Sequence, residues 1–290
     1  MSGALATGSE REPDGGRAPS FWRRARTSPT LLAGCTITAL IVLAAILAPL
    51  ISPDGPDQQD LYHILSGFSG HHPLGTDELG RDELSRLLFA GRTDLKVGAL
   101  AVIFPFCFGT LVGTLAGYYG GLVDSIVMRI VDVVIAFPFY VLVIGLVFVV
   151  GPGQRGIYVA FAVADWVVYA RTIRASTLIV READYVAAAR TGGIGDLRIL
   201  ARHVLPNTIT QAIVYVMNDI VLVIVAVVTL GYLGLGVQPP TPDWGAMISD
   251  GQEFLTTRWT LSTIPGIAVV LTGLGLSLIG DGLADVLRPR

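Results

Sequence analysis

Three aspartates lie within or beside long apolar runs of this chain, namely Asp132, Asp165 and Asp219. An ionisable side chain at membrane depth is costly and usually faces a solute or ion pathway, so each is a candidate for a translocation path. Asp219 is the preferred candidate, because its apolar run follows directly on a long hydrophilic segment. Structural interpretations stay open for the others. Asp132 is placed to pair with Arg129 one turn away, and Asp165 to reach the membrane interface or to bond to a Tyr or Trp.

His71-His72, close to Asp77, is a second group that could do chemistry, because imidazole and carboxylate groups bind zinc or nickel. We find no third and fourth ligand at a useful spacing, so we interpret this segment as a solvent-exposed loop and predict no metal site. Cys35 and Cys107 lie in apolar runs without a Cys-x-x-Cys or Cys/His spacing. They are therefore interpreted as small hydrophobic residues.

The chain lacks a phosphate-binding loop of the G-x-x-x-x-G-K-[ST] type, and its only lysine, Lys96, does not follow a glycine-rich turn. Without backbone donors and a lysine to hold phosphates, the chain is not expected to bind ATP or another cofactor itself, or to be an enzyme. The net charge of −3 gives no reason to expect a nucleic-acid partner.

Composition indicates which elements must position these residues. Hydrophobic residues make up 52% of the chain and charged residues only 15%, whereas a soluble domain carries about 25% charged residues. Because a spanning helix needs about 20 mostly apolar residues, we predict six, at Leu31–Ile51, Val97–Val123, Val133–Gln154, Gly156–Ala170, Ile209–Leu235 and Trp259–Gly280. The predicted fold class is an all-α membrane protein with six transmembrane helices.

Basic residues flank these spans unevenly, and arginines concentrate before the first span, in the segment 171–208 and at the C-terminus. The excess of positive charge faces the cytoplasm, so both termini are predicted to be cytoplasmic in a multi-pass protein of a bacterial inner membrane. Residues 1–29 then form a cytoplasmic tail and residues 30–290 the transmembrane domain. Within that domain, 52–94 is an extracytoplasmic loop and 171–208 a cytoplasmic loop.

The segment Arg181–Asn207 predicts a helix, a glycine turn and a second helix. Residues 182–190 are rich in alanine and other good helix formers. Gly192-Gly193 is typical of a helix C-terminus, because glycine readily adopts positive φ. The second helix is predicted from Asp196, as its N-cap, to residue 204, and Pro206 is predicted to break it before the fifth span.

This segment resembles the EAA loop of binding-protein-dependent ABC importer permeases, in which EAA, three residues, Gly, nine residues and I-x-L-P follow one another. Residues 187–189 stand at the EAA positions, Gly193 is the glycine, and residues 203–206 close the motif. Ala187 replaces the first Glu and His203 replaces Ile. The first change removes one carboxylate that a partner could bind.

Two further segments carry the resemblance. Residues 72–82 read HPLGTDELGRD, which is similar to the segment after the first span in the peptide/nickel subfamily. Residues 231–245 read GYLGLGVQPPTPDWG, which is similar to that subfamily's segment at the end of the fifth span. The three motifs together resemble the C-type subunit of dipeptide and oligopeptide importers.

The resemblance implies a type I permease with a coupling loop that contacts an ATPase. The implied partners are a B-type permease, two ATPase subunits or one fused ATPase that bind ATP and Mg²⁺, and an extracytoplasmic solute-binding protein in addition to the lipid bilayer. The residues that the resemblance assigns to the coupling loop are Asp184, Tyr185, Ala187, Ala188, Ala189, Arg190, Gly193, Arg198, His203, Leu205 and Pro206.

Other interpretations stay open at this point. Permeases for nickel or another small solute share these motifs, and a stand-alone secondary transporter would use the three aspartates without a partner ATPase. Gly109, Gly113 and Gly117 recur every four residues on the second span. Such a stripe indicates close packing of helices, and the alternative is a hinge.

Overall fold

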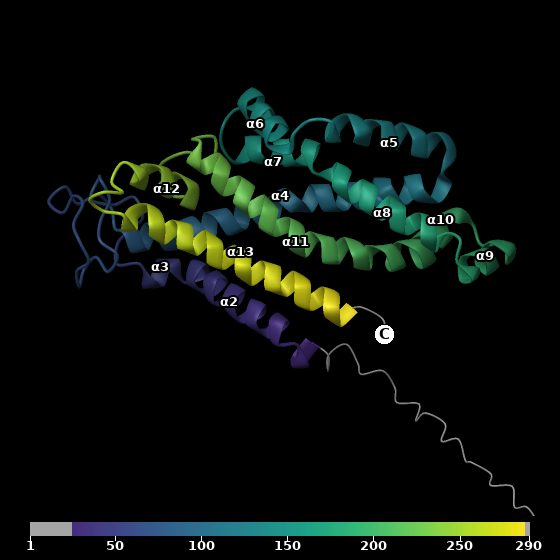
Figure 1. Ribbon diagram of the computed structural model, residues 1–290, viewed down its shortest axis with the longest axis horizontal. Coiled ribbons are helices and arrows are strands. Elements are labelled where there is room, and N and C mark those ends of the chain that lie inside the picture. The colour runs from purple at the N-terminus through teal and green to yellow at the C-terminus, as the bar shows by residue number, and fades with distance from the viewer. Residues whose placement is uncertain (1–24, 288–290) are drawn as a thin grey trace, which may run out of the picture.

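The computed structural model describes residues 25–287, and within that range the chain is helical with no β-strand. Residues 1–24 of the predicted tail 1–29 therefore lie outside the described residues. The helices form an elongated bundle (Figure 1). A loop of residues 52–82 and helix α12 lie at one end, here called the α12 end, and helices α9 and α10 lie at the other, the α9 end.

The helices follow the apolar runs. In chain order they are α2 (Pro29–Ile46), α3 (Ala48–Ile51), α4 (Glu83–Tyr119), α5 (Gly121–Ile135), α6 (Phe139–Val150), α7 (Gln154–Ala164), α8 (Trp166–Val180), α9 (Asp184–Thr191), α10 (Asp196–Ile199), the π-helix η1 (Leu200–Val204), α11 (Leu205–Tyr232), α12 (Trp244–Gln252) and α13 (Thr260–Leu287). Five helical stretches are long and apolar enough to cross a membrane, and the bent pair α5–α6 passes the same test when its two helices are taken together. The predicted all-α membrane fold is confirmed.

The third span is not the continuous helix that we predicted over Val133–Gln154. Helices α5 and α6 meet at an angle of 88°, and the bend falls just before Phe139, where Pro138 is the N-cap of α6. Proline disfavours helical backbone at the residue before it and cannot donate to the preceding turn. The apolar composition predicted the span, but this proline decides its shape.

The fourth span is longer than the predicted Gly156–Ala170. Helices α7 and α8 join at Asp165, whose N–H donates to Phe161 O at 2.9 Å, and together they cover 154–180. Arg174 lies inside α8, where its guanidinium forms a double hydrogen bond with Asp124 of α5, with Nη2 2.5 Å from Oδ2. The connection predicted over 171–208 therefore starts only after Val180.

Helix α4 begins at Glu83, so the last part of the predicted loop 52–94 is helical. Asp82 is the N-cap and accepts from the Ser85 N–H at 2.7 Å. The helix has 37 residues, which at ~1.5 Å per residue is about 55 Å, well beyond a hydrocarbon core of about 30 Å. It ends at Gly120, where φ is +64°. α4 therefore runs most of the way between the two ends of the bundle.

The glycine stripe on α4 packs against α8. A Cβ added at Gly109 would collide with the carbonyl oxygen of Trp166, and one at Gly113 with that of Ala170. At Gly117 an added Cβ would come within 2.7 Å of Thr177 Cβ. The packing interpretation of the stripe is thus confirmed, since only glycine lets the two backbones approach this closely.

Candidate functional site

The α9–η1 segment (residues 184–204) has the predicted helix, glycine turn and helix. Helix α9 covers Asp184–Thr191, close to the predicted residues 182–190. The chain then reverses at Gly193, whose φ is +77°. The Gly193 N–H donates to Arg190 O and the Ile194 N–H to Ala189 O, both at 3.1 Å. Gly193 thus occupies the left-handed conformation expected for a glycine after a helix.

Pro206 does not break the chain before the fifth span, contrary to the prediction. It lies in the first turn of α11, directly after the π-helix η1, in which the Leu205 N–H donates to Leu200 O. The wider π turn changes the position of the carbonyl that a proline ring would meet in a regular α-helix. Helix therefore runs without interruption from Asp196 to Tyr232, and it joins the α9–η1 segment rigidly to a membrane span.

A small cluster holds the segment against the end of α4. Val186, Ala189 and Ile199 pack on Tyr118. The Tyr118 hydroxyl donates to Asp196 Oδ1 at 2.7 Å, and the Arg190 guanidinium lies 5.6 Å above the Tyr118 ring. Asp196 was predicted as an N-cap, but Gly195 holds that position. The Asp196 carboxylate instead bonds a tyrosine far away in the sequence, which the local pattern could not indicate.

The residues predicted to couple with an ATPase divide into two groups. Ala189 is buried against Tyr118, and His203 and Leu205 are half-buried. The others are exposed: Asp184, Tyr185, Ala187, Ala188, Arg190, Gly193, Arg198 and Pro206. Two large apolar side chains are also exposed here, Tyr185 at 46% and Leu197 at 79%. Sequence reasoning missed Leu197, although an apolar residue on a short polar helix was a visible signal.

The structure brings two of the three membrane aspartates together. Asp165 and Asp219 are 4% and 3% exposed, and their carboxyl groups are close enough to interact directly. The Tyr169 hydroxyl donates to Asp219 Oδ2 at 2.6 Å, which supplies a partner that a buried carboxyl needs. The Tyr215 ring packs edge-on against Tyr169 with centroids 4.9 Å apart.

Asp132 is not part of this cluster. Its side chain is exposed on α5. Among the ion pairs of the described residues, none joins it to Arg129, so the interpretation of a helix-surface pair is wrong. Of the three candidates, Asp165 and Asp219 share one site between α7–α8 and α11, and Asp132 lies apart from it.

A groove runs along one exposed face of α11, next to this cluster, and its mostly apolar lining carries several amide and hydroxyl groups. It has a volume of about 590 Å³ and is lined by Thr172 of α8, by Ala284 and Leu287 of α13, and by α11 residues Asn207, Thr210, Gln211, Val214, Tyr215 and Asn218. Ligand sites commonly measure about 300–1,000 Å³. Tyr215 lines the groove and packs against Tyr169, which bonds Asp219. Three amides at helical spacing in an apolar run were the sequence signal for this face, and we did not predict it.

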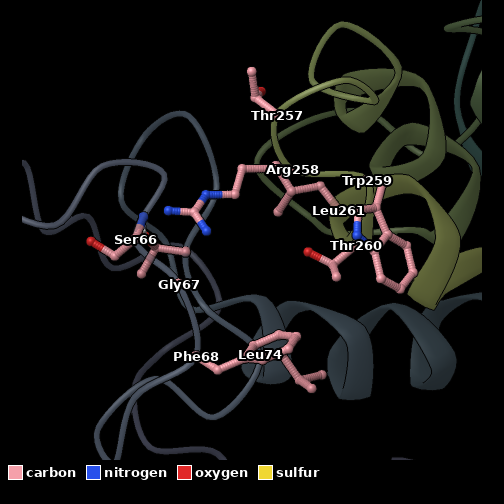
Figure 2. Close-up of a pocket in the computed structure, with 10 residues that line it drawn as sticks. Ser66, Gly67, Phe68, Leu74, Thr257, Arg258, Trp259, Thr260 and Leu261 are labelled. Carbon is pink, nitrogen blue, oxygen red and sulfur yellow. Dashed lines mark hydrogen bonds between the residues drawn. The ribbon is translucent and has the colours of Figure 1, made fainter.

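A smaller cleft of about 180 Å³ lies at the α12 end, between the 52–82 loop and the start of α13. Figure 2 shows Arg258 reaching from the α13 side towards Ser66 and Gly67 of the loop, with Phe68 and Leu74 below. The cleft is thus formed by two segments far apart in the sequence, and its most polar side chain is a cation.

Comparison with known protein families shows to which family this chain belongs. Residues 109–290 match the family described as the binding-protein-dependent transport system inner membrane component. The chain belongs to this family. Residues 19–68 of the permease also match the N-terminal TM domain of oligopeptide transport permease C. The resemblance seen in the three motifs is therefore confirmed.

Relatives match the permease over nearly its whole length. It is 36% identical over 278 residues to the dipeptide transport system permease protein DppC of Alkalihalophilus pseudofirmus, covering 94% of this chain and 91% of the relative. It is 38% identical over 271 residues to the glutathione transport system permease protein GsiD of Pectobacterium atrosepticum, covering 93% and 90%. It is 36% identical over 276 residues to the di/tripeptide transport system permease protein DppC of Pseudomonas aeruginosa, covering 93% and 91%.

Proposed function

We propose that this permease is one half of the membrane pathway of an ATP-driven importer that carries dipeptides and other short peptides across a bacterial inner membrane. The relatives named above are permeases for a dipeptide, for di- and tripeptides and for glutathione. The observation that carries the proposal is the groove on α11. Its amides and hydroxyls offer the donors and acceptors that a peptide backbone needs, on the surface of an otherwise apolar bundle.

The same face supports a second permease as partner. Asn207, Gln211 and Asn218 are exposed, and polar side chains at membrane depth face another helix or a water-filled cavity rather than lipid. A B-type permease placed against α8, α11 and α13 would close the groove into a pathway between the two subunits. Asp219 would then lie behind Tyr215, one layer away from the solute.

The α9 end supports the ATPase contact. Tyr185 and Leu197 present exposed apolar area on a segment that continues into the span α11, so a movement of the segment is transmitted to the groove. In this proposal, two ATPase subunits or one fused ATPase bind ATP and Mg²⁺ there on the cytoplasmic side. A solute-binding protein docks at the opposite, extracytoplasmic α12 end, and both chain termini are cytoplasmic.

Uptake by the reconstituted complex tests the proposal. Proteoliposomes with the complete transporter should accumulate a labelled dipeptide only when ATP is present, and should not accumulate Ni²⁺. Asn218→Leu should reduce dipeptide uptake at least tenfold, because it removes a groove amide. Thr36→Leu is the control, since Thr36 is an exposed polar residue on α2 outside the groove. Uptake by this chain alone without nucleotide, or equal uptake by both variants, would contradict the proposal.

A further inference from the structure

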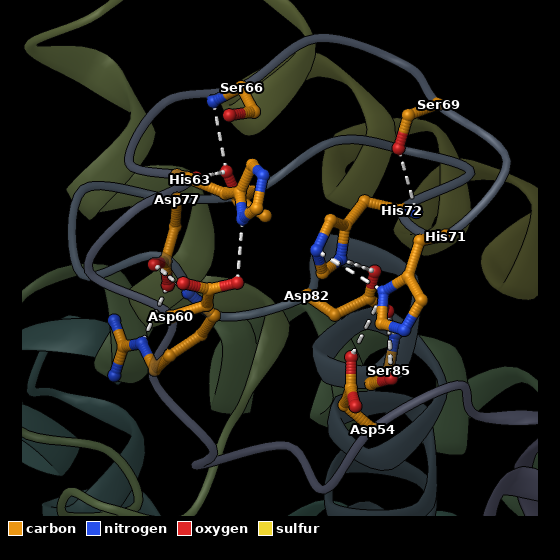
Figure 3. A network of polar contacts seen from close by, with 12 residues as sticks. Asp54, Asp60, His63, Ser66, Ser69, His71, His72, Asp77, Asp82 and Ser85 are labelled. Carbon is orange, nitrogen blue, oxygen red and sulfur yellow. Dashed lines mark hydrogen bonds and ion pairs between the residues drawn. The ribbon is translucent and has the colours of Figure 1, made fainter.

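The 52–82 loop contains a buried histidine whose ring orientation is set by a hydrogen bond to a carboxylate. His72 is 6% exposed, and its Nδ1 lies 3.0 Å from Asp82 Oδ1. The other Asp82 oxygen accepts from the Ser85 N–H and from the Ser85 hydroxyl, both at 2.7 Å. A carboxylate can only accept, so Nδ1 carries the hydrogen in the neutral His72 ring, and Nε2 then offers a lone pair. Figure 3 shows this arrangement.

Two further ligand groups face that lone pair. His72 Nε2 lies 3.4 Å from His71 Nδ1, and His71 Nδ1 lies 3.7 Å from Asp54 Oδ2. One ligand atom from each of the three residues lies within 4.8 Å of the others. Tetrahedral zinc at ~2.0–2.1 Å from each nitrogen would separate two ligating nitrogens by about 3.3 Å, close to the spacing of the two histidine nitrogens.

We propose that Asp54, His71 and His72 bind one divalent transition-metal ion of the zinc class, while the Asp82 carboxylate holds the His72 ring in place through Nδ1. Two imidazoles and one carboxylate suit Zn²⁺ or Ni²⁺ rather than Ca²⁺ or Mg²⁺, which prefer oxygen ligands. A histidine ligand that donates its other N–H to a carboxylate is the usual arrangement at such sites. The His71 side chain is 72% exposed, so an ion can enter from solvent.

A neighbouring pair competes for the same histidine. Asp60 and His63 also have ligand atoms within 4.8 Å of His72. However, His63 Nδ1 and Asp60 Oδ2 are only 2.6 Å apart and already satisfy one another. A metal ion there would have to separate this pair first, whereas the three atoms of Asp54, His71 and His72 need only small shifts. The assignment therefore goes to His71 and not to His63.

The ion would connect three segments of the 52–82 loop. Asp54 follows α3 closely, His71 and His72 lie in the middle of the loop, and Asp82 caps α4. A metal ion bound to these residues would hold the C-terminal end of α3 close to the N-terminal end of α4. The inference does not depend on the transported solute; only the placement of the loop on the extracytoplasmic side rests on the proposed function.

Zinc binding to the purified full-length permease tests the site independently of transport. The protein is prepared in lipid nanodiscs with an affinity tag free of histidine, on a Cys35→Ser, Cys107→Ser background that removes the two thiols. Titration with Zn²⁺, followed by calorimetry and by metal analysis after dialysis, should give one ion per chain. His71→Ala and Asp54→Asn should each weaken binding at least about tenfold, because the loss of even a residue that only supports a ligand typically costs that much.

Two histidine variants serve as controls. His63→Ala removes the neighbouring pair, and His203→Ala removes the remaining histidine at the α9 end, since the chain has four histidines. Both should bind Zn²⁺ like the parent protein. Because His71 is exposed, its variant should melt at the parent temperature without zinc, which separates loss of a ligand from loss of the fold. Zinc binding that is absent in the parent, unchanged in His71→Ala, or lost in His63→Ala would overturn the assignment.

Discussion

The two ends of the bundle are held together by different kinds of contact. At the α12 end, Asp77 accepts from the backbone N–H groups of Leu79 and Arg81 at 2.9 Å and from Arg81 Nε at 2.6 Å, and it pairs with Arg86 at 3.4 Å. At the α9 end, the α9–η1 segment is held by a small apolar cluster and the hydrogen bond from Tyr118 to Asp196.

This difference indicates which end can move. Buried charges with several partners have one favourable arrangement, because any displacement leaves a charge unpaired in a dry site. A short helix on a small apolar cluster can open or tilt at lower cost, and mobile elements come from such weakly held regions. We therefore expect the α12 end to act as a fixed platform and the α9 end as the moving part.

The largest expected effect comes from breaking the platform. Asp77→Ala leaves the buried Arg86 guanidinium without its carboxylate and leaves Arg81 only its pair with Glu78. This loss should cost about 3–5 kcal/mol. Thermal unfolding of the purified permease in detergent, followed by size-exclusion chromatography, should show a lower midpoint and less folded protein. Asp57→Ala changes an exposed aspartate of the same loop and is the control. Equal midpoints for the two variants would show that the network does not stabilise this end.

Loss of the proposed ATPase contact at the α9 end should be the next largest effect. Leu197→Glu places a charge on the exposed apolar tip of the α9 end, and central contact residues of interfaces are worth about 2 kcal/mol or more. Co-purification with the ATPase should fall at least about thirtyfold while the level of permease in the membrane is unchanged. Tyr62→Glu alters a side chain that is 97% exposed at the α12 end, and it should leave co-purification intact. The reverse result would exchange the roles of the two ends.

A change at the glycine turn should have a moderate effect. Gly193→Ala forces an L-residue to φ +77°, at a cost of about 1–2 kcal/mol. Hydrogen exchange of residues 184–199 should speed up, and ATP-driven uptake should decline. Gly195→Ala is a matched control, because an added Cβ also meets open space there but φ is −66°. If both variants behave alike, the positive φ has no part in the function of the segment.

The smallest expected effect comes from removing the Tyr118 hydroxyl, which joins α4 to α10. Tyr118→Phe keeps the ring in its cluster but removes the bond to Asp196, which is worth about 1 kcal/mol. The amides of α10 should exchange about fivefold faster, with no change in the global unfolding temperature. Tyr119→Phe removes a hydroxyl from the adjacent, exposed tyrosine and should change neither quantity. An unchanged exchange rate in Tyr118→Phe would mean that the apolar cluster alone holds the segment.

The sequence by itself determined the apolar spans, the glycine turn and the family motifs. Lipid exposure acts on each residue separately, so composition along the chain is enough to locate spans. Positive φ at Gly193 is a property of one residue, and it too was readable. The bend before α6 also had a local cause in Pro138. We missed it because the apolar composition of the run continues across the bend.

Only the tertiary structure decided which distant side chains meet. Asp165 and Asp219 come together because α7–α8 and α11 pack on common neighbours. Asp54 reaches His71 only because the 52–82 loop folds back on itself, which is why the sequence showed no third ligand for the histidines. Pro206 stayed helical because the preceding turn widened. Contacts of this kind depend on which faces of several helices pack at once, and that information is not contained in any one segment of the chain.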